Sequence, residues 1–274
     1  MPSPGRLTSV LLRRRLPLDT RFGLLRAELR RRLRPKTAYA LRYGPGVVFL
    51  SHSDYAIDWE SFKWAVADDA YPTDYDGAVV LDVGAHKGYY SAHALARGAR
   101  TVVSFEPEAA NLAFLERAAA AYRERGADWR IRASAVGGER GEAQLRVMEG
   151  SWAHSLHPPD SWARYEVGTQ RVAVEAMVDI LGETKSLLGD GSRLIVKVNT
   201  EGEECAIVLE TPPEAWSSVS ELFVEMHEWA PCTAAELAAH LAPAGFSVIP
   251  TEMAAVLRLR REAAPRSDRR SAPT

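Results

Sequence analysis

A glycine-rich turn between two apolar runs is the part of this sequence that points most directly to chemistry. The first run, residues 79–83, contains Asp82, and the second, residues 101–105, leads directly into Glu106 and Pro107. The turn after the first run consists of Gly84, Ala85, His86, Lys87 and Gly88. A strand, a glycine turn, a helix and a second strand that ends in an acid form the unit that binds an adenosine-bearing cofactor. We therefore expect the glycines to bring the backbone close to a ligand and Glu106 to accept hydrogen bonds from ribose hydroxyls.

The acid that precedes the turn distinguishes between two cofactors. Asp82 stands just before Gly84, where a carboxylate would repel the pyrophosphate of a dinucleotide. The glycine pattern also differs from the G-x-G-x-x-G of dinucleotide-binding turns. A nearby carboxylate instead attracts the ammonium and sulfonium groups of S-adenosylmethionine (SAM). The turn therefore predicts SAM as the cofactor, and the alternative is an ordinary strand-to-helix turn that binds no cofactor.

Polar residues that follow the other apolar runs extend this site. Three further runs end near residues 134–136, 199–204 and 225–228. Ligands of parallel α/β sheets bind at the carboxyl ends of the strands, so we expect these residues to meet in one crevice. The predicted cofactor-binding residues are Asp82, Gly84, Ala85, His86, Lys87, Gly88, Glu106, Pro107, Ser134, Ala135, Val136 and Asn199.

Apolar runs alternate with amphipathic segments along the chain. The predicted strands lie at residues 47–50, 79–83, 102–105, 129–135, 194–198 and 222–226, with a closing hairpin at 246–249 and 254–259. The predicted helices lie at residues 59–66, 91–97, 109–125 and 234–241. This alternation predicts an α/β fold with a mostly parallel sheet that helices cover on both faces.

A polar insertion separates two added strands, which we predict at residues 144–148 and 171–174. The insertion contains Trp152, His154, Ser155 and Trp162. Such a segment is typical of a lid over the substrate, and the alternative is a loop that packs its tryptophans on the sheet.

Composition limits the classes of partner. The chain has 274 residues, of which 46% are hydrophobic, and a net charge of −2. It therefore has enough apolar residues for a large core and lacks the overall positive charge of a nucleic-acid-binding protein. No apolar run reaches the length of about 18 residues that spans a bilayer. The two cysteines, Cys205 and Cys232, are too few for a disulfide framework, which favours a reducing, cytoplasmic location.

Positive charge is concentrated at the N-terminus. Residues 1–36 contain ten arginines and one lysine against Asp19 and Glu28, with four leucines at near-helical spacing between residues 24 and 33. This pattern predicts a basic amphipathic helix, which either contacts a membrane or an acidic partner, or packs its leucines on the main domain. We favour the second interpretation. We divide the chain into a basic helical extension at 1–45, a SAM-binding domain at 46–259 and a disordered tail at 260–274.

Taken together, the motifs resemble those of a known family. They are Asp82 to Gly88, Phe-Glu-Pro at 105–107, Val-Asp-Ile-Leu at 178–181, Lys-Val-Asn-Thr-Glu-Gly-Glu-Glu at 197–204 and Glu-Met-His at 225–227. The first two occur in many class I methyltransferases, whereas Lys-x-x-x-Glu-Gly-x-Glu is more specific. Over residues 45–250 the chain is similar to the FkbM family of SAM-dependent methyltransferases. The resemblance implies a seven-stranded, Rossmann-like methyltransferase fold and methyl transfer to a hydroxyl of a small molecule, often in natural-product or glycan biosynthesis.

The sequence departs from the family pattern at two positions. The family usually has Asn where His86 stands and Asp where Asn199 stands. An asparagine accepts hydrogen bonds but cannot act as a base. These changes admit another interpretation, a methyltransferase-like module that binds SAM without turnover. A weaker alternative is an NAD-dependent oxidoreductase, which the missing dinucleotide turn disfavours.

Methyl transfer to a hydroxyl requires positioning of the two reactants and removal of a proton. We predict His227 as the base, because it follows the fifth strand and has an ordinary pKa near 6.5. The predicted catalytic residues are His227, Asn199 and Glu201, with no metal ligand among them. Lys197 is expected to form a buried ion pair with Glu201 or Glu225. The expected partner is a hydroxylated small molecule, and association with a second copy of the chain is left open.

Overall fold

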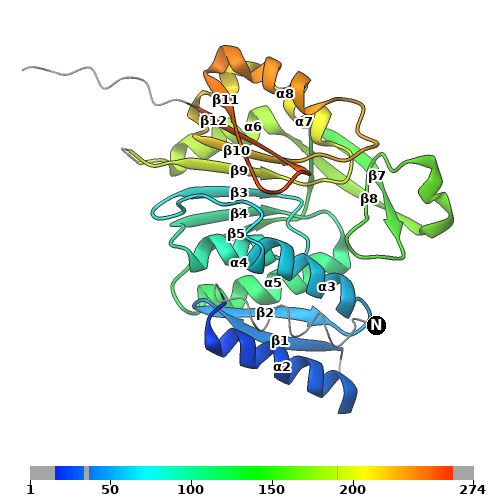
Figure 1. The fold of residues 1–274 in the computed structure, drawn as a ribbon. Coiled ribbons are helices and arrows are strands. Elements are labelled where there is room, and N and C mark those ends of the chain that lie inside the picture. Colours follow the sequence, from blue (N-terminus) through cyan, green and yellow to red (C-terminus); the bar gives the residue numbers. More distant parts are fainter. Residues whose placement is uncertain (1–15, 34–36, 190, 262–274) are drawn as a thin grey trace, which may run out of the picture.

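The computed structural model describes residues 16–33, 37–189 and 191–261. The central element is a seven-stranded sheet with the strand order β11-β12-β10-β9-β3-β4-β5 (Figure 1). Its strands are β3 (Val79–Val83), β4 (Thr101–Phe105), β5 (Asp128–Arg132), β9 (Leu194–Val198), β10 (Glu221–Glu225), β11 (Phe246–Ile249) and β12 (Val256–Arg261). Neighbouring strands are parallel except at β12, which runs antiparallel to both β10 and β11. The predicted α/β fold, with a mostly parallel seven-stranded sheet and helices on both faces, is confirmed.

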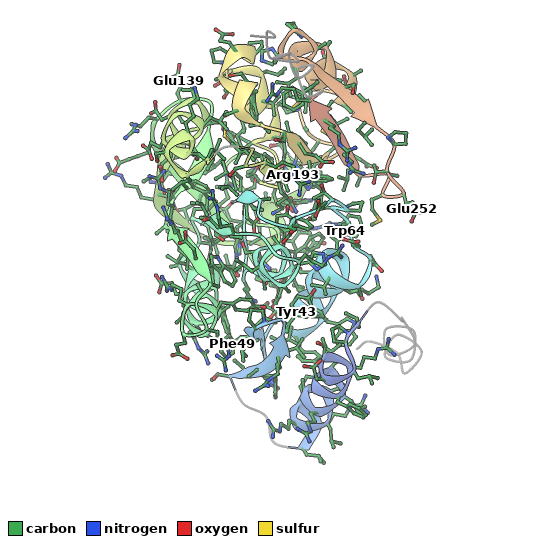
Figure 2. All side chains as sticks on the ribbon, turned by 90° about the vertical axis from the view of Figure 1, so that its left-hand side faces the viewer. Tyr43, Phe49, Trp64, Glu139, Arg193 and Glu252 are labelled. Atoms are coloured by element: carbon green, nitrogen blue, oxygen red, sulfur yellow. A yellow bond between two sulfur atoms is a disulfide. The ribbon has the colours of Figure 1, made fainter. Side chains whose placement is uncertain are left out.

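Helices cover both faces of the sheet because its inner strands are apolar on both sides. The helices are α3 (Tyr55–Phe62), α4 (Tyr89–Ala96), α5 (Ala109–Arg123), α6 (Met177–Thr184), α7 (Glu204–Leu209) and α8 (Ala234–Leu241). Val80 and Val102 belong to one core with residues of α3, α4 and α5. Leu81 and Val103, each one residue further along, belong to a second core with residues of α6, α7 and α8. Side chains fill the space between the sheet and these helices (Figure 2).

Two smaller sheets flank the central one. Strands β6 (Ala135–Gly137), β7 (Gly141–Met148) and β8 (Glu166–Ala176) form a sheet in the order β6-β8-β7. The predicted strand at 129–135 was therefore wrong in extent, because the chain leaves the central sheet after Arg132 and enters a different sheet at Ala135. The strands predicted at 144–148 and 171–174 are parts of β7 and β8, and the insertion between them includes the 3-10 helix Asp160–Tyr165.

The N-terminal part of the described chain is a helix followed by a hairpin. Helix α2 (Leu18–Leu33) packs on β1 (Ala38–Tyr43), which pairs with β2 (Gly46–Ser51). The boundary we set between residues 45 and 46 falls in the turn of this hairpin. At the other end, β12 continues through Arg261, and the rest of the predicted tail lies outside the described residues. No helix in the described ranges is long and apolar enough to cross a membrane.

Cys205 and Cys232 form a disulfide, with their α-carbons 5.8 Å apart. Cys205 lies in α7, and Cys232 lies just before α8. Helices α7 and α8 contact each other, so tertiary packing brings together two cysteines that are 27 residues apart. Because the two cysteines are bonded to each other, their low number no longer argues for a reducing compartment.

We expect Cys232→Ser to lower the free energy of unfolding by about 3 kcal/mol, the contribution of a disulfide that closes a loop of this size. Urea unfolding under non-reducing conditions measures this. Adding dithiothreitol should bring the wild-type protein to the stability of the variant. Equal stability of the two proteins without reductant would show that the cross-link does not stabilise the fold.

Candidate active site

The carboxyl ends of β3, β4, β9 and β10 open into one cavity of about 550 Å³. This volume lies within the range of small-molecule and cofactor sites, roughly 300–1,000 Å³. The predicted site residues that line the cavity are Gly84, Ala85, His86, Glu106, Pro107, Ser134, Ala135, Val136, Asn199 and Glu201. Further walls come from outside the central sheet and are mostly apolar or aromatic, with Ile57, Trp64, Tyr71, Tyr89, Leu145 and Trp152.

Glu106 lies at the end of β4 and is buried in the cavity wall. Its Oε2 accepts the backbone N–H of His86 at 2.8 Å, and its Oε1 accepts the N–H of Glu108 at 2.9 Å. Burial raises the pKa of Glu106 to about 8, while these two N–H donors stabilise the carboxylate and oppose the shift. Each carboxylate oxygen can accept a second hydrogen bond, so Glu106 is able to bind ligand hydroxyls.

The glycines of the turn are required by the packing of the protein around them. Gly84 has a φ of +75°, and a Cβ there would overlap the carbonyl oxygen of Asn199 on β9. Gly88 has a φ of +86°, and a Cβ there would meet Leu115 and Trp129 within 2.8 Å. At both positions the room that a Cβ would need is therefore taken up by the protein itself. Only Gly84 of the two lines the cavity.

Asp82 does not line the cavity, in contrast to our prediction. Its carboxylate is fully buried, 3.0 Å from Lys197 Nζ, and accepts the hydroxyl of Ser91 at 2.6 Å. Lys197 also donates to the carbonyl of Gly84 at 2.7 Å and lines the cavity itself. The buried ion pair predicted for Lys197 exists, but its partner is Asp82 rather than Glu201 or Glu225. Asp82 thus holds the β3 turn through Lys197 and does not contact the cavity directly.

Lys87 does not line the cavity either. Its Nζ lies 2.6 Å from Asp58 of α3 and 3.3 Å from the hydroxyls of Ser51 and Ser151. It is almost completely buried, so its charge depends on Asp58 for compensation. Lys87 ties the turn to α3 and β2, and its predicted part in cofactor binding is corrected.

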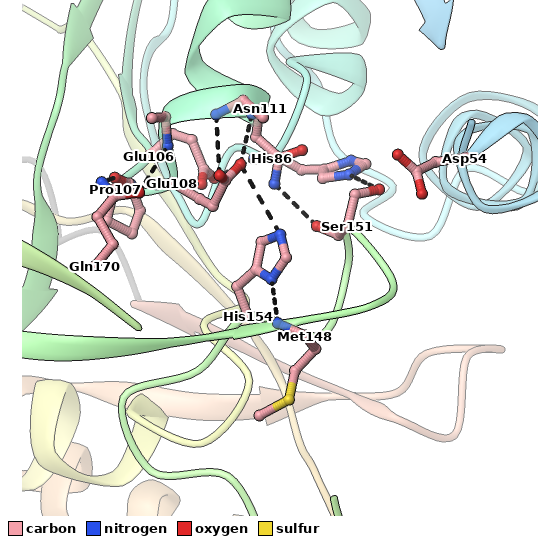
Figure 3. A network of polar contacts seen from close by, with 12 residues as sticks. Asp54, His86, Glu106, Pro107, Glu108, Asn111, Met148, Ser151, His154 and Gln170 are labelled. Atoms are coloured by element: carbon pink, nitrogen blue, oxygen red, sulfur yellow. Dashed lines mark hydrogen bonds and ion pairs between the residues drawn. The ribbon is translucent and has the colours of Figure 1, made fainter. Parts of the chain in front are cut away.

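The insertion between β7 and β8 reaches the cavity through a hydrogen-bonded network (Figure 3). Asn111 of α5 donates to the carbonyl of Ser151 at 2.9 Å, and the Ser151 hydroxyl lies 3.2 Å from His86 Nε2. His154 accepts the N–H of Met148, and its other ring nitrogen lies 3.9 Å from Glu108. Burial lowers the pKa of both His86 and His154, which favours their neutral forms. The insertion therefore forms part of the cavity wall next to the β3 turn and the start of α5.

A second polar group occupies the β9 and β10 side of the cavity. Glu225 Oε2 accepts the hydroxyl of Tyr71 at 2.6 Å and the amide of Asn199 at 3.0 Å. Burial, reinforced by Glu225, raises the pKa of Tyr71, which therefore stays a hydrogen-bond donor. Asn199 Oδ1 is buried without a hydrogen-bond partner among the described residues, although Asn199 lines the cavity. A buried acceptor of this kind is costly unless a ligand or a water donates to it.

His227 is not placed as a base, in contrast to our prediction. It does not line the cavity, and its ring nitrogens lie 3.3 Å from Glu201 and 3.2 Å from Glu204. Burial alone would lower the pKa of His227, but the two carboxylates outweigh it and raise the pKa to about 10. The ring is therefore a cation at neutral pH and has no free lone pair for a proton. Glu201, one of the two carboxylates that contact His227, lines the cavity. Its backbone has a φ of +57°, a conformation that is uncommon for residues other than glycine.

No family model and no curated protein matches the chain. Among solved structures, the methyltransferase FkbM from Methylobacillus flagellatus KT aligns with 15% identity and a TM-score of 0.46, over 72% of this chain and 47% of that one. The chain thus spans about half the length of that protein. Magnesium protoporphyrin IX methyltransferase from Synechocystis PCC 6803, with bound SAM, aligns with 14% identity and a TM-score of 0.37, over 74% and 77% of the two chains. An rRNA methylase from Streptococcus thermophilus aligns with 10% identity and a TM-score of 0.38, over 68% and 87%. The chain is similar to these methyltransferases.

Sequence reasoning missed the wall residues that lie outside the central sheet. Tyr71 falls in an irregular segment between the π-helix Lys63–Ala67 and β3, where no periodic pattern marks it. Trp64 and Ile57 carry only the amphipathic pattern of a helix that covers the sheet. Tyr89 follows the glycine turn directly, and this adjacency is the one signal that could have identified it.

Proposed function

We propose that this chain is a SAM-dependent methyltransferase that methylates a hydroxyl group of a small molecule. The observation that carries the proposal is the position of Glu106. It ends the strand next to the glycine turn, lines the cavity and can accept two ribose hydroxyls. The residues of the cavity fit SAM in a second respect, because the unpartnered Oδ1 of Asn199 is a suitable acceptor for an ammonium group. When bound, SAM supplies a methyl group that its sulfonium activates.

The acceptor is expected to bind on the Glu225 side of the cavity. Ile57, Trp64 and Trp152 provide an apolar wall that fits a body with little charge. Glu225 is a carboxylate at the cavity surface, and Tyr71 and Asn199 hold it in place. It can therefore accept the proton that the acceptor hydroxyl loses as its oxygen becomes methylated. Glu201 also lines the cavity, as Asn199 does, and is expected to lie next to the bound acceptor.

Ligand-dependent thermal melting tests the cofactor assignment. SAM or S-adenosylhomocysteine at about 100 times its dissociation constant should stabilise the protein by about 2.7 kcal/mol, whereas NAD should have no effect. Stabilisation by NAD alone would overturn the proposal in favour of a dinucleotide enzyme. Stabilisation by SAM without release of S-adenosylhomocysteine across a broad panel of hydroxylated sugars, nucleosides and polyketides would favour a binding module instead.

We expect Glu106→Ala to weaken SAM binding at least tenfold, because it removes two hydrogen bonds to the ribose hydroxyls, each of which contributes about 1 kcal/mol even where the carboxyl group is neutral. Isothermal titration calorimetry on the folded variant measures the affinity. Glu116→Ala, on an exposed position of α5, serves as a control and should bind like the wild type. Unchanged affinity of the Glu106→Ala variant would place the ribose of SAM elsewhere.

A further inference from the structure

Helix α2 is attached to the protein by its small and polar face. Thr20 donates to the carbonyl of Arg42 on β1, and Leu24 and Ala27 are buried. Glu28 is also buried and pairs with Arg31, whose guanidinium lies 5.0 Å from the centre of the Tyr55 ring. These contacts fix which side of α2 faces the hairpin and α3.

The opposite face of α2 carries large apolar side chains that are exposed. We call Leu18, Phe22, Leu25, Leu29 and Leu33 the α2 stripe. Each of these residues is between 46% and 70% exposed. At about 3.6 residues per turn they fall within roughly 80° of the helix circumference. Isolated apolar residues are normal on a protein surface, but a continuous row along four turns of helix indicates a binding surface.

This arrangement corrects our preferred reading of the N-terminal helix. We expected its leucines to pack on the main domain, yet of the four between residues 24 and 33 only Leu24 does so. In both views α2 lies at one end of the molecule, outside the hairpin β1-β2 (Figures 1 and 2). The α2 stripe therefore faces away from the rest of the described chain.

Arginines border the α2 stripe along both edges. Arg26 and Arg30 are exposed on one side, and the exposed Arg32 lies on the other. The helix has five arginines against Asp19 and Glu28, and Arg13-Arg14-Arg15 precede it in the sequence. Two copies that met stripe to stripe would bring these basic edges together and repel each other. A surface of opposite charge with an apolar layer beneath it complements both the stripe and its edges.

We propose that the α2 stripe docks the protein on the surface of a membrane that contains anionic phospholipids. The apolar side chains enter the boundary between headgroups and acyl chains, and the arginines contact the anionic headgroups. Helix α2 lies in the plane of this boundary, and its packed face keeps the main domain outside the lipid. This surface is separate from the cavity, so the proposal does not depend on methyl transfer.

Co-sedimentation of the full chain with vesicles tests the proposal. We expect binding to phosphatidylcholine vesicles that contain phosphatidylserine to be at least about tenfold stronger than to pure phosphatidylcholine, and to weaken as salt increases. The triple variant Phe22→Ser, Leu25→Ser, Leu29→Ser should lose this binding. Arg26→Gln with Arg30→Gln should weaken it by about tenfold.

A control variant removes three exposed apolar side chains elsewhere on the surface. Val167, Val178 and Val248 are exposed on other elements, so the triple variant that changes each to serine should bind the vesicles like the wild type. Circular dichroism checks that both triple variants keep the wild-type fold. Absence of binding to anionic vesicles, or equal binding by the α2 triple variant, would overturn the proposal. A concentration-dependent dimer that this variant abolishes, without vesicle binding, would assign the stripe to a second copy instead.

Discussion

Replacing Glu225 by glutamine is expected to reduce turnover by about 10²–10⁴-fold, the usual contribution of a positioned base. The amide keeps the size of the side chain and can still accept a hydrogen bond from Tyr71 or Asn199, but it cannot take a proton. Affinity for SAM should stay within a few-fold of the wild type, because the carboxylate serves the acceptor. Homocysteine release in a coupled assay, together with calorimetric binding of SAM, separates the two quantities.

Glu228→Gln is the matched control, because Glu228 is an exposed carboxylate in the same segment. It should leave turnover and affinity unchanged. If the Glu225→Gln variant turned over within a few-fold of the wild type, positioning alone would drive transfer and the proton would leave to water. A large loss of SAM affinity in that variant would instead place Glu225 at the cofactor.

The second large effect concerns stability. We expect His227→Gln to lower the free energy of unfolding by about 3–5 kcal/mol at neutral pH, because it leaves Glu201 and Glu204 without their cation. The pKa of His227 is raised in the folded protein to about 10 from its ordinary 6.5. Its stabilising contribution is therefore complete below pH 6.5 and is lost as the pH rises through about 10. Urea unfolding at neutral pH and above pH 10 measures both effects.

Between these two pH values the wild type should lose more stability than the His227→Gln variant. The difference between the two proteins in free energy of unfolding should therefore shrink at high pH. His157→Gln, which removes a largely exposed histidine beside Glu203, should cost little at either pH. A variant that keeps wild-type stability but loses turnover, with a rate that titrates near pH 6.5 in the wild type, would restore His227 as the base.

Glu106 and His227 differ in how well their roles could be predicted from the sequence. Both residues follow an apolar strand, and the strand order places both strand ends at the same edge of the sheet. Glu106 was located correctly because its position depends on the strand and the glycine turn next to it in sequence. His227 was not, because its role depends on Glu201 and Glu204, which belong to a different strand end. The ion pair raises the pKa of the His227 ring, and no sequence pattern near His227 predicts this ion pair.

The partners of Lys87 and of Cys205 are likewise distant in sequence. Lys87 belongs to a motif that predicts contact with a ligand, but its buried ammonium group forms an ion pair with Asp58 of α3 instead. The bond between Cys205 and Cys232 exists because α7 packs on α8. In each case the partner is distant in sequence, so only the packed structure identifies it.

The α/β class, the core strands of the central sheet and the edge of the sheet that forms the cavity follow from the sequence, because hydrophobic period and strand-end chemistry are local properties. Strand β1 and helix α6 were not predicted, and the strand at 129–135 was predicted too long. The tertiary structure decided which polar side chains face the cavity and which compensate one another inside the protein. It also decided the orientation of α2. That helix has one face with Leu24 and Ala27 and another with Phe22 and Leu29, and the sequence allows either to pack. Contacts with β1 and Tyr55 select the first face, because it combines small side chains with an ion pair that the hairpin and α3 can cover.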